Sequence, residues 1–147
     1  MASFVYNVAK AGFASGALDW DTHTFKLMLI DNAYTPNPDH ATVSALTELP
    51  NGTGYTGGFN GSGRKTLSVC SVVQVDASDR AELRVSLATT WSAINAGTVK
   101  AAVVIREMTN DADSIPVVYI DSGGFPVVTN GGDFTFTPNV AGVAQLG

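Results

Sequence analysis

Residues 52–66, GTGYTGGFNGSGRKT, come close to the pattern of a phosphate-binding loop. Gly58 and Gly63 have the spacing of the two glycines in G-x-x-x-x-G-K-[ST], but Arg64 separates Gly63 from Lys65. Such a loop also needs a helix directly after the lysine, because the helix N-terminus helps to hold the phosphates. Here the lysine is followed by TLSVCSVVQV, whose alternation predicts a strand. We therefore expect a glycine-rich loop with unusual backbone angles and no nucleotide site.

Two acidic groups have spacings that occur in metal sites. Asp19, Asp21 and His23 alternate and would share one face of a strand, but DWDT is typical of a turn in which aspartate caps local N–H groups. Asp111 and Asp113 match the first two ligands of a calcium loop, but the required glycine and the closing glutamate are replaced by proline and serine. We expect polar turns at both places and no metal ion.

The usual catalytic sets are missing from the sequence. The chain has two histidines and one cysteine, and it contains neither G-x-S-x-G nor HExxH. His40 stands beside Asp39, but no nucleophile is spaced near this pair. Cys70 lies among valines and is predicted to be a small buried hydrophobe. We expect a protein that is not an enzyme and that carries no cofactor.

The composition favours a protein that packs against other chains. The 147 residues fit one domain spanning 1–147, and only 14% of them are charged. The net charge is −5 and the 8 basic residues are scattered, which argues against nucleic acid as a partner. The opening MASFVYNVAK lacks the pattern of a signal peptide, and no apolar run is long enough for a membrane span. A surface with few charges is easily desolvated, so it suits protein interfaces.

The hydrophobic pattern predicts a mainly β chain. An apolar stripe favours one helix over residues 3–15, capped by Ser3 and stopped by Gly16, within an N-terminal segment 1–18. Runs with a period of two predict strands at 24–30, 66–75, 80–87, 98–108, 115–120, 133–137 and 140–146. These short strands, joined by Gly/Asn/Asp turns, indicate a single antiparallel β-sandwich or jelly-roll-like domain.

The clearest alternation lies in residues 80–87. It predicts that Ala81, Leu83, Val85 and Leu87 face the core, while Arg80, Glu82, Arg84 and Ser86 face solvent. The same phase continues to Trp91, which we expect in the core.

Residues 31–65 form the longest stretch without a continuous pattern. They hold three of the six prolines and many glycines, and 43–49 could add a short helical turn or strand. A long excursion inside a compact domain usually binds something. We therefore interpret 31–65 as an interaction loop in which Tyr34, Tyr55 and Phe59 are contact groups and not core.

Several segments, in this order, resemble a family of small structural proteins of tailed bacteriophages. The resemblance spans nearly the whole chain and depends on the following stretches: LDWDTHTFKLMLID, AYTPN, GTGYTGG, RAELRVSLATTW, VVYIDSGG and NGGDFTFTPNVAGVAQL. It implies a virion component, foremost a capsid decoration (cement) protein that is made in the host cytoplasm and binds the capsid surface. No catalytic residue is transferred by the resemblance.

A cement protein would contact the major capsid protein and neighbouring copies of itself as a homo-oligomer. Besides the loop aromatics, Phe4, Val5 and Tyr6 are the candidate contact residues, although Phe4 and Val5 could equally pack on their own sheet. One alternative is a tail, baseplate or fibre-associated protein. Another is a carbohydrate-binding module, with Trp20 and Trp91 as the residues that would stack on sugars.

Overall fold

The computed structural model describes residues 3–147, which are mainly β. In chain order the elements are β1 (Phe4–Val5), α1 (Asn7–Ser15), β2 (Lys26–Asp31), the 3-10 turn η1 (Val43–Ala45), β3 (Lys65–Thr66), β4 (Cys70–Val75), the 3-10 turn η2 (Asp76–Ser78), β5 (Arg80–Val85), β6 (Thr89–Trp91), β7 (Thr98–Arg106), β8 (Ile115–Ile120), β9 (Val127–Val128), β10 (Phe134–Phe136) and β11 (Ala144–Leu146). All strand pairings among the described residues are antiparallel. The predicted fold class is confirmed: the structure is consistent with a single β-sandwich-like domain.

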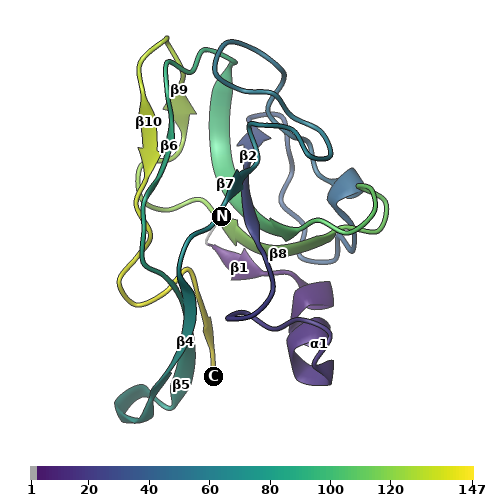
Figure 1. Cartoon of the computed structure of the whole chain (residues 1–147), viewed down its shortest axis with the longest axis vertical. Coiled ribbons are helices and arrows are strands. Elements are labelled where there is room, and N and C mark those ends of the chain that lie inside the picture. Colours follow the sequence, from purple (N-terminus) through teal and green to yellow (C-terminus); the bar gives the residue numbers. More distant parts are fainter. Residues whose placement is uncertain (1–2) are drawn as a thin grey trace.

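The strands form three separate sheets. The central sheet has the order β1-β8-β7-β2-β3, and β9 pairs with the other end of β7. A two-stranded sheet joins β10 to β6, and a three-stranded sheet has the order β11-β5-β4. We call this last sheet the hairpin sheet, because its β4–β5 hairpin projects from the body at the lower left of Figure 1, whereas α1 lies at the lower right. The long segment 31–65 curls over the upper right of the body (Figure 1).

The central sheet carries the core because both of its faces are covered. Met28 and Leu29 are neighbours on β2 and therefore point to opposite faces, yet neither side chain is exposed. The same holds along β7, where Val103 and Val104 are both buried. Sheets covered on both faces read as continuous apolar runs, which explains the AAVVI stretch of β7.

The N-terminal helix is shorter than the sequence predicted. It begins at Asn7 after an N-cap at Tyr6 that makes no side-chain capping bond, so the predicted cap at Ser3 is wrong. Phe4 and Val5 instead form β1, where they pair with Tyr119 and Val118 of β8. The predicted end is confirmed: Gly16 adopts a left-handed conformation with φ +80°, which glycine allows without strain.

The predicted strand 66–75 is two strands in different sheets. Thr66 pairs with β2, whereas the chain from Cys70 onward pairs with β5. Between them Val69 has φ +56°, an uncommon conformation for a β-branched residue, and it redirects the chain from one sheet to the other. Periodicity could not show this break, because both strands share the same alternation.

The alternation predicted for 80–87 is confirmed at Leu83 and Val85 but wrong at two other positions. Leu87 is 54% exposed, because β5 ends at Val85 and the chain leaves the hairpin sheet there. Glu82 is only 2% exposed, although it lies on the outward face.

Two glycines of the 52–66 loop allow a matched test of how closely this loop is packed. Gly54 (φ +75°) and Gly58 (φ +84°) both adopt backbone angles that an alanine resists. A Cβ on Gly54 would also lie 2.6 Å from the Ser92 carbonyl oxygen, whereas one on Gly58 would meet nothing within 4 Å. We expect Gly58→Ala to cost about 1 kcal/mol and Gly54→Ala about 2–4 kcal/mol in urea unfolding. Equal losses would mean that the loop is not closely packed against the 92–94 backbone.

Candidate interaction surfaces

Arg64, the residue that interrupts the phosphate-loop pattern, holds the long 31–65 segment in place. Its side chain is 1% exposed. Nε and Nη2 donate to the two carboxylate oxygens of Glu48 at 2.9 and 2.6 Å, and Nη1 and Nη2 donate to those of Asp111 at 2.7 and 3.0 Å. Nη1 also donates to Glu107 at 3.0 Å. All five guanidinium N–H groups are therefore used, so this site is closed to an external phosphate.

The carboxylates around Arg64 bind the glycine-rich loop as well. Glu48 accepts the Tyr55 hydroxyl at 2.8 Å and the Gly58 N–H at 2.9 Å. Glu107 accepts the Asn60 N–H at 3.1 Å and pairs with Lys26 of β2. One buried cation thus links the loop, β2 and the segment after β7. We call Arg64, Glu48, Glu107, Asp111 and Lys26 the arginine cluster.

Charge and burial act in opposite directions on the pKa values of the cluster. Burial by itself raises the pKa of Glu107, but hydrogen bonds from Lys26, Asn60 and Arg64 outweigh it and hold this pKa below its ordinary 4.5. Burial would also lower the pKa of Arg64, and the bonds to the carboxylates reverse this effect. Burial and the charge of Glu48 raise the pKa of Tyr55, so its phenol stays a neutral donor. The ionised forms of Arg64 and Glu107 are therefore favoured, and Arg64 has no N–H group left for an external ligand.

Three of the six predicted contact residues are core residues. Tyr6, Tyr34 and Tyr55 are 0–2% exposed, so the expectation that Tyr34 and Tyr55 are contact groups outside the core is wrong. Tyr55 donates to the partly buried Glu48, and the hydroxyls of Tyr6 and Tyr34 lie 3.2 Å apart. The sequence signal was ambiguous, since a tyrosine in a loop can offer its ring to a partner or close the loop over the core.

The other three predicted contact residues keep less surface than we expected. Val5 is buried, and Phe4 is half-buried and stacks on Tyr119 with ring centroids 5.0 Å apart. Phe59 is half-buried. Of the predicted set, only Phe4 and Phe59 have ring surface left for a partner, and their role stays a prediction.

The polar pairs seen in the sequence serve local structure. The Asp19 N–H donates to His23 Nδ1 at 3.0 Å, and Asp113 accepts N–H groups of Thr109 and Asn110, as the predicted turns require. His40 Nδ1 lies 2.8 Å from the Tyr34 hydroxyl. No group of three or more His, Cys, Asp or Glu within residues 3–147 could hold a metal ion.

Both tryptophans are buried and use their indole N–H groups inside the protein. Trp91 Nε1 donates to the Gly63 carbonyl at 2.7 Å, and Trp20 Nε1 donates to the Arg84 carbonyl at 3.0 Å. The core position of Trp91 is confirmed. The carbohydrate-binding alternative therefore loses the two rings on which it depended. The Trp20 bond also fastens the root of the hairpin sheet to the body.

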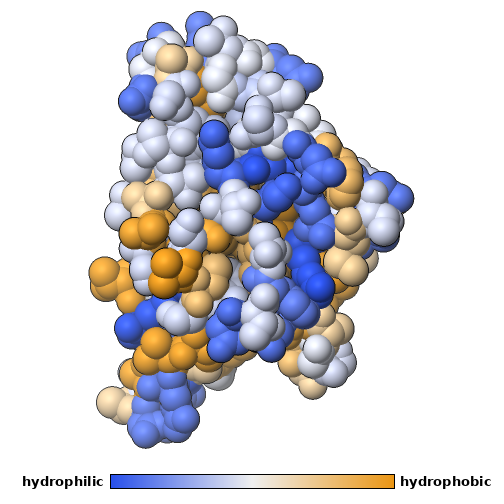
Figure 2. Space-filling view, viewed as in Figure 1, coloured by the Kyte–Doolittle hydropathy of each residue, from blue (hydrophilic) through white to orange (hydrophobic). Residues whose placement is uncertain are grey.

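Three of the six large apolar side chains that stay exposed within residues 3–147 lie on or next to the β4–β5 hairpin, which sequence reasoning missed, and the other three are Met108, Val128 and Val140. Val69 and Val72 are 62% and 48% exposed, and Leu87 follows the end of β5. Figure 2 shows apolar surface over the root of this sheet and the neighbouring C-terminal segment, while the tip of the hairpin is largely hydrophilic. Among residues 3–147, β4 is an edge strand that pairs with β5 alone, and its residues CSVVQV carry no charge. Exposed, uncharged edges are the parts of a sheet that most readily add another chain.

The opposite face of the hairpin sheet carries an ion cluster. Glu82 lies between Arg80 and Arg84, and each guanidinium donates two hydrogen bonds to one of its carboxylate oxygens at 2.6–3.0 Å. The two arginine side chains, which are themselves partly exposed, cover the carboxylate. Hydrogen bonds from Arg80 and then Arg84 hold the pKa of Glu82 below its ordinary 4.5. This face therefore carries partly exposed arginine side chains, whereas Val72 lies on the opposite face, which is the one suited to an interface.

No family model, curated protein or solved structure matches this chain. Within residues 3–147, no helix is long and apolar enough to span a membrane.

Removing the buried cation tests the arginine cluster. We expect Arg64→Met to destabilise the protein by about 3–5 kcal/mol, because it leaves three carboxylates without their common partner. Arg64→Lys should recover only part of this loss, since an ammonium cannot bond two carboxylates bidentately. Lys65→Met removes the same charge from the next residue, which takes no part in the cluster, and it should change stability by less than about 0.5 kcal/mol. Similar losses in both methionine variants, measured by urea unfolding, would contradict the anchoring role.

Acid should weaken the fold through the carboxylates whose pKa values are depressed. For Glu107 and Glu82 the folded pKa lies below the ordinary 4.5, so their stabilisation is present above that value and is lost as the pH falls through the folded pKa. We expect the urea midpoint to fall as the pH drops below about 4.5 and Glu107→Gln to flatten this fall. Asp79→Asn, at a residue outside these ion pairs, serves as the control and should keep the wild-type slope.

Proposed function

We propose that this protein is a structural component of a bacteriophage virion that binds the outer surface of the assembled capsid and reinforces it. The observation that supports this most directly is the projecting hairpin sheet, which leaves Val69, Val72 and Leu87 in solvent at or beside β4, an uncharged edge strand. The sequence resemblance to small tailed-phage structural proteins points the same way.

The physical demands of such a role agree with the fold. A decoration protein must stay compact and hold neighbouring subunits together by contact alone. The arginine cluster fixes the long loop, and Tyr34 and Tyr55 of this loop belong to the core. The hairpin sheet then offers apolar area and free backbone groups, the two components that bury well against another chain.

The partners in this proposal are the major capsid protein and neighbouring copies of the same chain. A tail, baseplate or fibre-associated protein would need similar surfaces, so surface chemistry does not separate the two assignments. Copy number does, because decoration proteins follow the capsid lattice while tail components follow the tail symmetry.

The deciding experiment is therefore the copy number of the protein in purified phage particles, measured by mass spectrometry against the major capsid protein. We expect on the order of hundreds of copies, in a simple ratio to the capsid subunits. A count of roughly a dozen or fewer would assign the protein to the tail. Absence from the particles would overturn a virion role altogether.

A pair of surface variants tests whether the hairpin sheet is the binding surface. Val72→Lys places a charge on the apolar face of β4, and it should weaken binding to undecorated capsids at least tenfold with little change in melting temperature. Val128→Lys makes the same change at a valine that is 72% exposed on β9, outside the hairpin sheet, and should bind like the wild type. Equal affinity of the two variants for undecorated capsids, measured by co-sedimentation, would place the interface elsewhere.

A further inference from the structure

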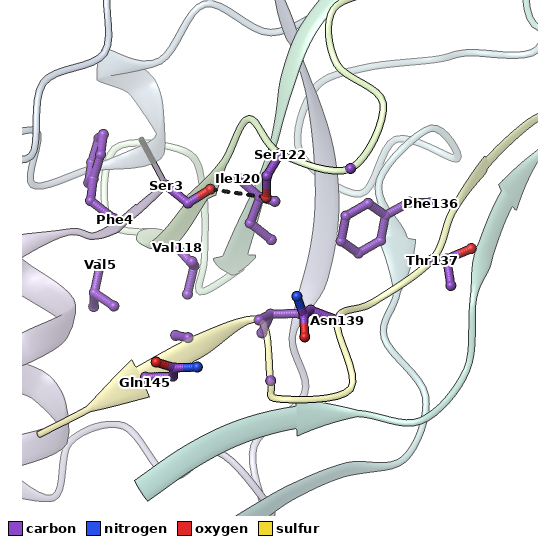
Figure 3. Close-up of a pocket in the computed structure, with 14 residues that line it drawn as sticks. Ser3, Phe4, Val5, Val118, Ile120, Ser122, Phe136, Thr137, Asn139 and Gln145 are labelled. Carbon is purple, nitrogen blue, oxygen red and sulfur yellow. Dashed lines mark hydrogen bonds between the residues drawn. The ribbon is translucent and has the colours of Figure 1, made fainter. Parts of the chain in front are cut away.

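The hairpin sheet ends in two edge strands that differ in their surroundings. β11 lies beside the body of the protein, because its Ala144 and Gln145 line a pocket of about 500 Å³ together with Val5 of β1 (Figure 3). β4 is the strand at the other end of the sheet, and it pairs with β5 alone among residues 3–147. Its Val72 is 48% exposed, and its Gln74 is exposed as well. β4 is therefore the outer edge of the hairpin sheet.

β4 is also the longest edge strand within residues 3–147. It has six residues, whereas the other strands with a single neighbour, namely β1, β3, β6, β9, β10 and β11, have two or three each. Proteins commonly protect a sheet edge by keeping it short or by placing a lysine, a proline or a bulge on it. The strand CSVVQV has no charge and no proline, and its pairing with β5 runs without a shift in register. Such an edge is open to pairing with another chain.

The hydrogen bonds of the hairpin sheet show which backbone groups of β4 are free. The Ser86 N–H donates to the Val69 carbonyl at 3.2 Å, so this pair, one step before the strand, is of the hydrogen-bonded type. The Val143 N–H donates to the Leu83 carbonyl at 2.8 Å, which shows that the backbone of Leu83 faces β11 and not β4. Bonded and unbonded pairs alternate along an antiparallel ladder. Every second residue of β4 therefore turns its N–H and C=O away from β5, namely Cys70, Val72 and Gln74.

These three residues can pair with the same three residues of a second copy. An antiparallel pairing about a two-fold axis at Val72 places Val72 opposite its own copy, and Cys70 opposite Gln74 of the second copy. All three pairs are then of the hydrogen-bonded type, because both members of each pair have free N–H and C=O groups. An axis one residue away in either direction would leave Cys70 or Gln74 without a partner in β4. The axis at Val72 thus uses every free residue of the strand.

The side chains along this edge suit a pairing of the chain with itself. Val72 meets Val72 at the axis, which is an apolar cross-strand pair, and Ser71 lies opposite Val73. No pair within β4 brings two charges together, although each chain has a net charge of −5. On the neighbouring strand, Glu82 is already bonded by two arginines of its own chain. A strand with a charged side chain opposite Val72 would lose water there without gaining a partner.

We propose that β4 is the surface through which two copies of this chain pair, edge to edge, into a dimer with its two-fold axis at Val72. The two hairpin sheets would become one continuous sheet in the order β11-β5-β4-β4-β5-β11. One patch meets the same patch of the other copy, which is the form of interface that closes a two-fold dimer.

The role of this dimer rests on the proposed function, in which a neighbouring copy is one of the two partners. A dimer would carry two capsid-binding surfaces, and attachment through both is stronger than attachment through one. A variant that separates the two copies should therefore also bind the capsid less tightly.

Charge swaps at Val72 test the axis directly. In the proposed pair the two Val72 residues lie opposite each other, about 5.5 Å apart between Cα atoms. Val72→Lys or Val72→Glu alone sets like charges against each other, and each should weaken the dimer about tenfold or more. An equimolar mixture of the two variants should restore the dimer, because lysine then faces glutamate. Val128→Lys, at an exposed valine of β9, is the matched control and should keep the wild-type dimer.

The measurement is sedimentation equilibrium of the full chain over a range of concentrations. Melting temperatures close to that of the wild type show that the variants are folded. A wild-type chain that stays monomeric at all concentrations would overturn the proposal. A dimer that Val72→Lys leaves intact, or a mixture of the two charge variants that stays monomeric, would do so as well.

Cysteine cross-links test the register with variants that add no charge. Gln74→Cys keeps the native Cys70, which lies opposite it in the second copy at a Cα separation that a disulfide can bridge. We expect diamide to cross-link Gln74→Cys into covalent dimers on a denaturing gel, and to leave the wild type and the Gln74→Cys, Cys70→Ser double variant as monomers. Val72→Cys combined with Cys70→Ser should cross-link as well. Cross-linking of Gln74→Cys that does not need Cys70 would exclude this register and overturn the proposal.

Two combined outcomes separate this proposal from the proposed function. Abundant protein in phage particles, together with a free chain that is monomeric and gives no cross-link at Val72→Cys, would overturn the pairing and leave the virion role intact. A dimer that responds to the charge swaps, formed by a protein that is absent from particles, would overturn the virion role and leave the pairing intact.

Discussion

The structure depends on one buried cation. Arg64 donates all five of its N–H groups to three carboxylates that come from distant parts of the chain. Two of these carboxylates, Glu48 and Glu107, also bind Tyr55, Gly58, Asn60 and Lys26. Removing two charged groups from water is costly unless each finds a partner of good geometry. Here every member of the cluster has such a partner, so a long segment rich in glycine and proline takes one conformation against the central sheet.

This constraint decides which surfaces remain for function. Because the long loop is closed over the core, Tyr34 and Tyr55 lie inside the protein, and the exposed apolar groups lie elsewhere, among them Val69, Val72 and Leu87 at the β4–β5 hairpin. The hairpin sheet is fastened to the body at its root by Trp20 and is otherwise built from its own three strands. A projecting sheet with one charged face and one apolar face can reach a neighbouring subunit while the body keeps its shape.

The separation into three sheets has a second consequence. Wherever a sheet ends, backbone N–H and C=O groups lie unpaired, and proteins usually cover or charge such edges. In this protein β1 ends the central sheet, β11 and β4 end the hairpin sheet, and β4 carries no charge. The uncharged edge of β4 is therefore a feature that suits the proposed attachment to a capsid.

The sequence by itself determined the β class, the positions of most strands, the end of the helix at Gly16 and the core position of Trp91, because these follow from local periodicity and backbone preference. It also showed that the glycine-rich stretch lacks the helix of a phosphate loop. Only the tertiary structure decided that Arg64 is buried, that Tyr34 and Tyr55 face inward and that residues 66–75 divide between two sheets. These outcomes depend on contacts between residues far apart in the chain, and no local pattern encodes which carboxylate or which strand edge a residue will meet.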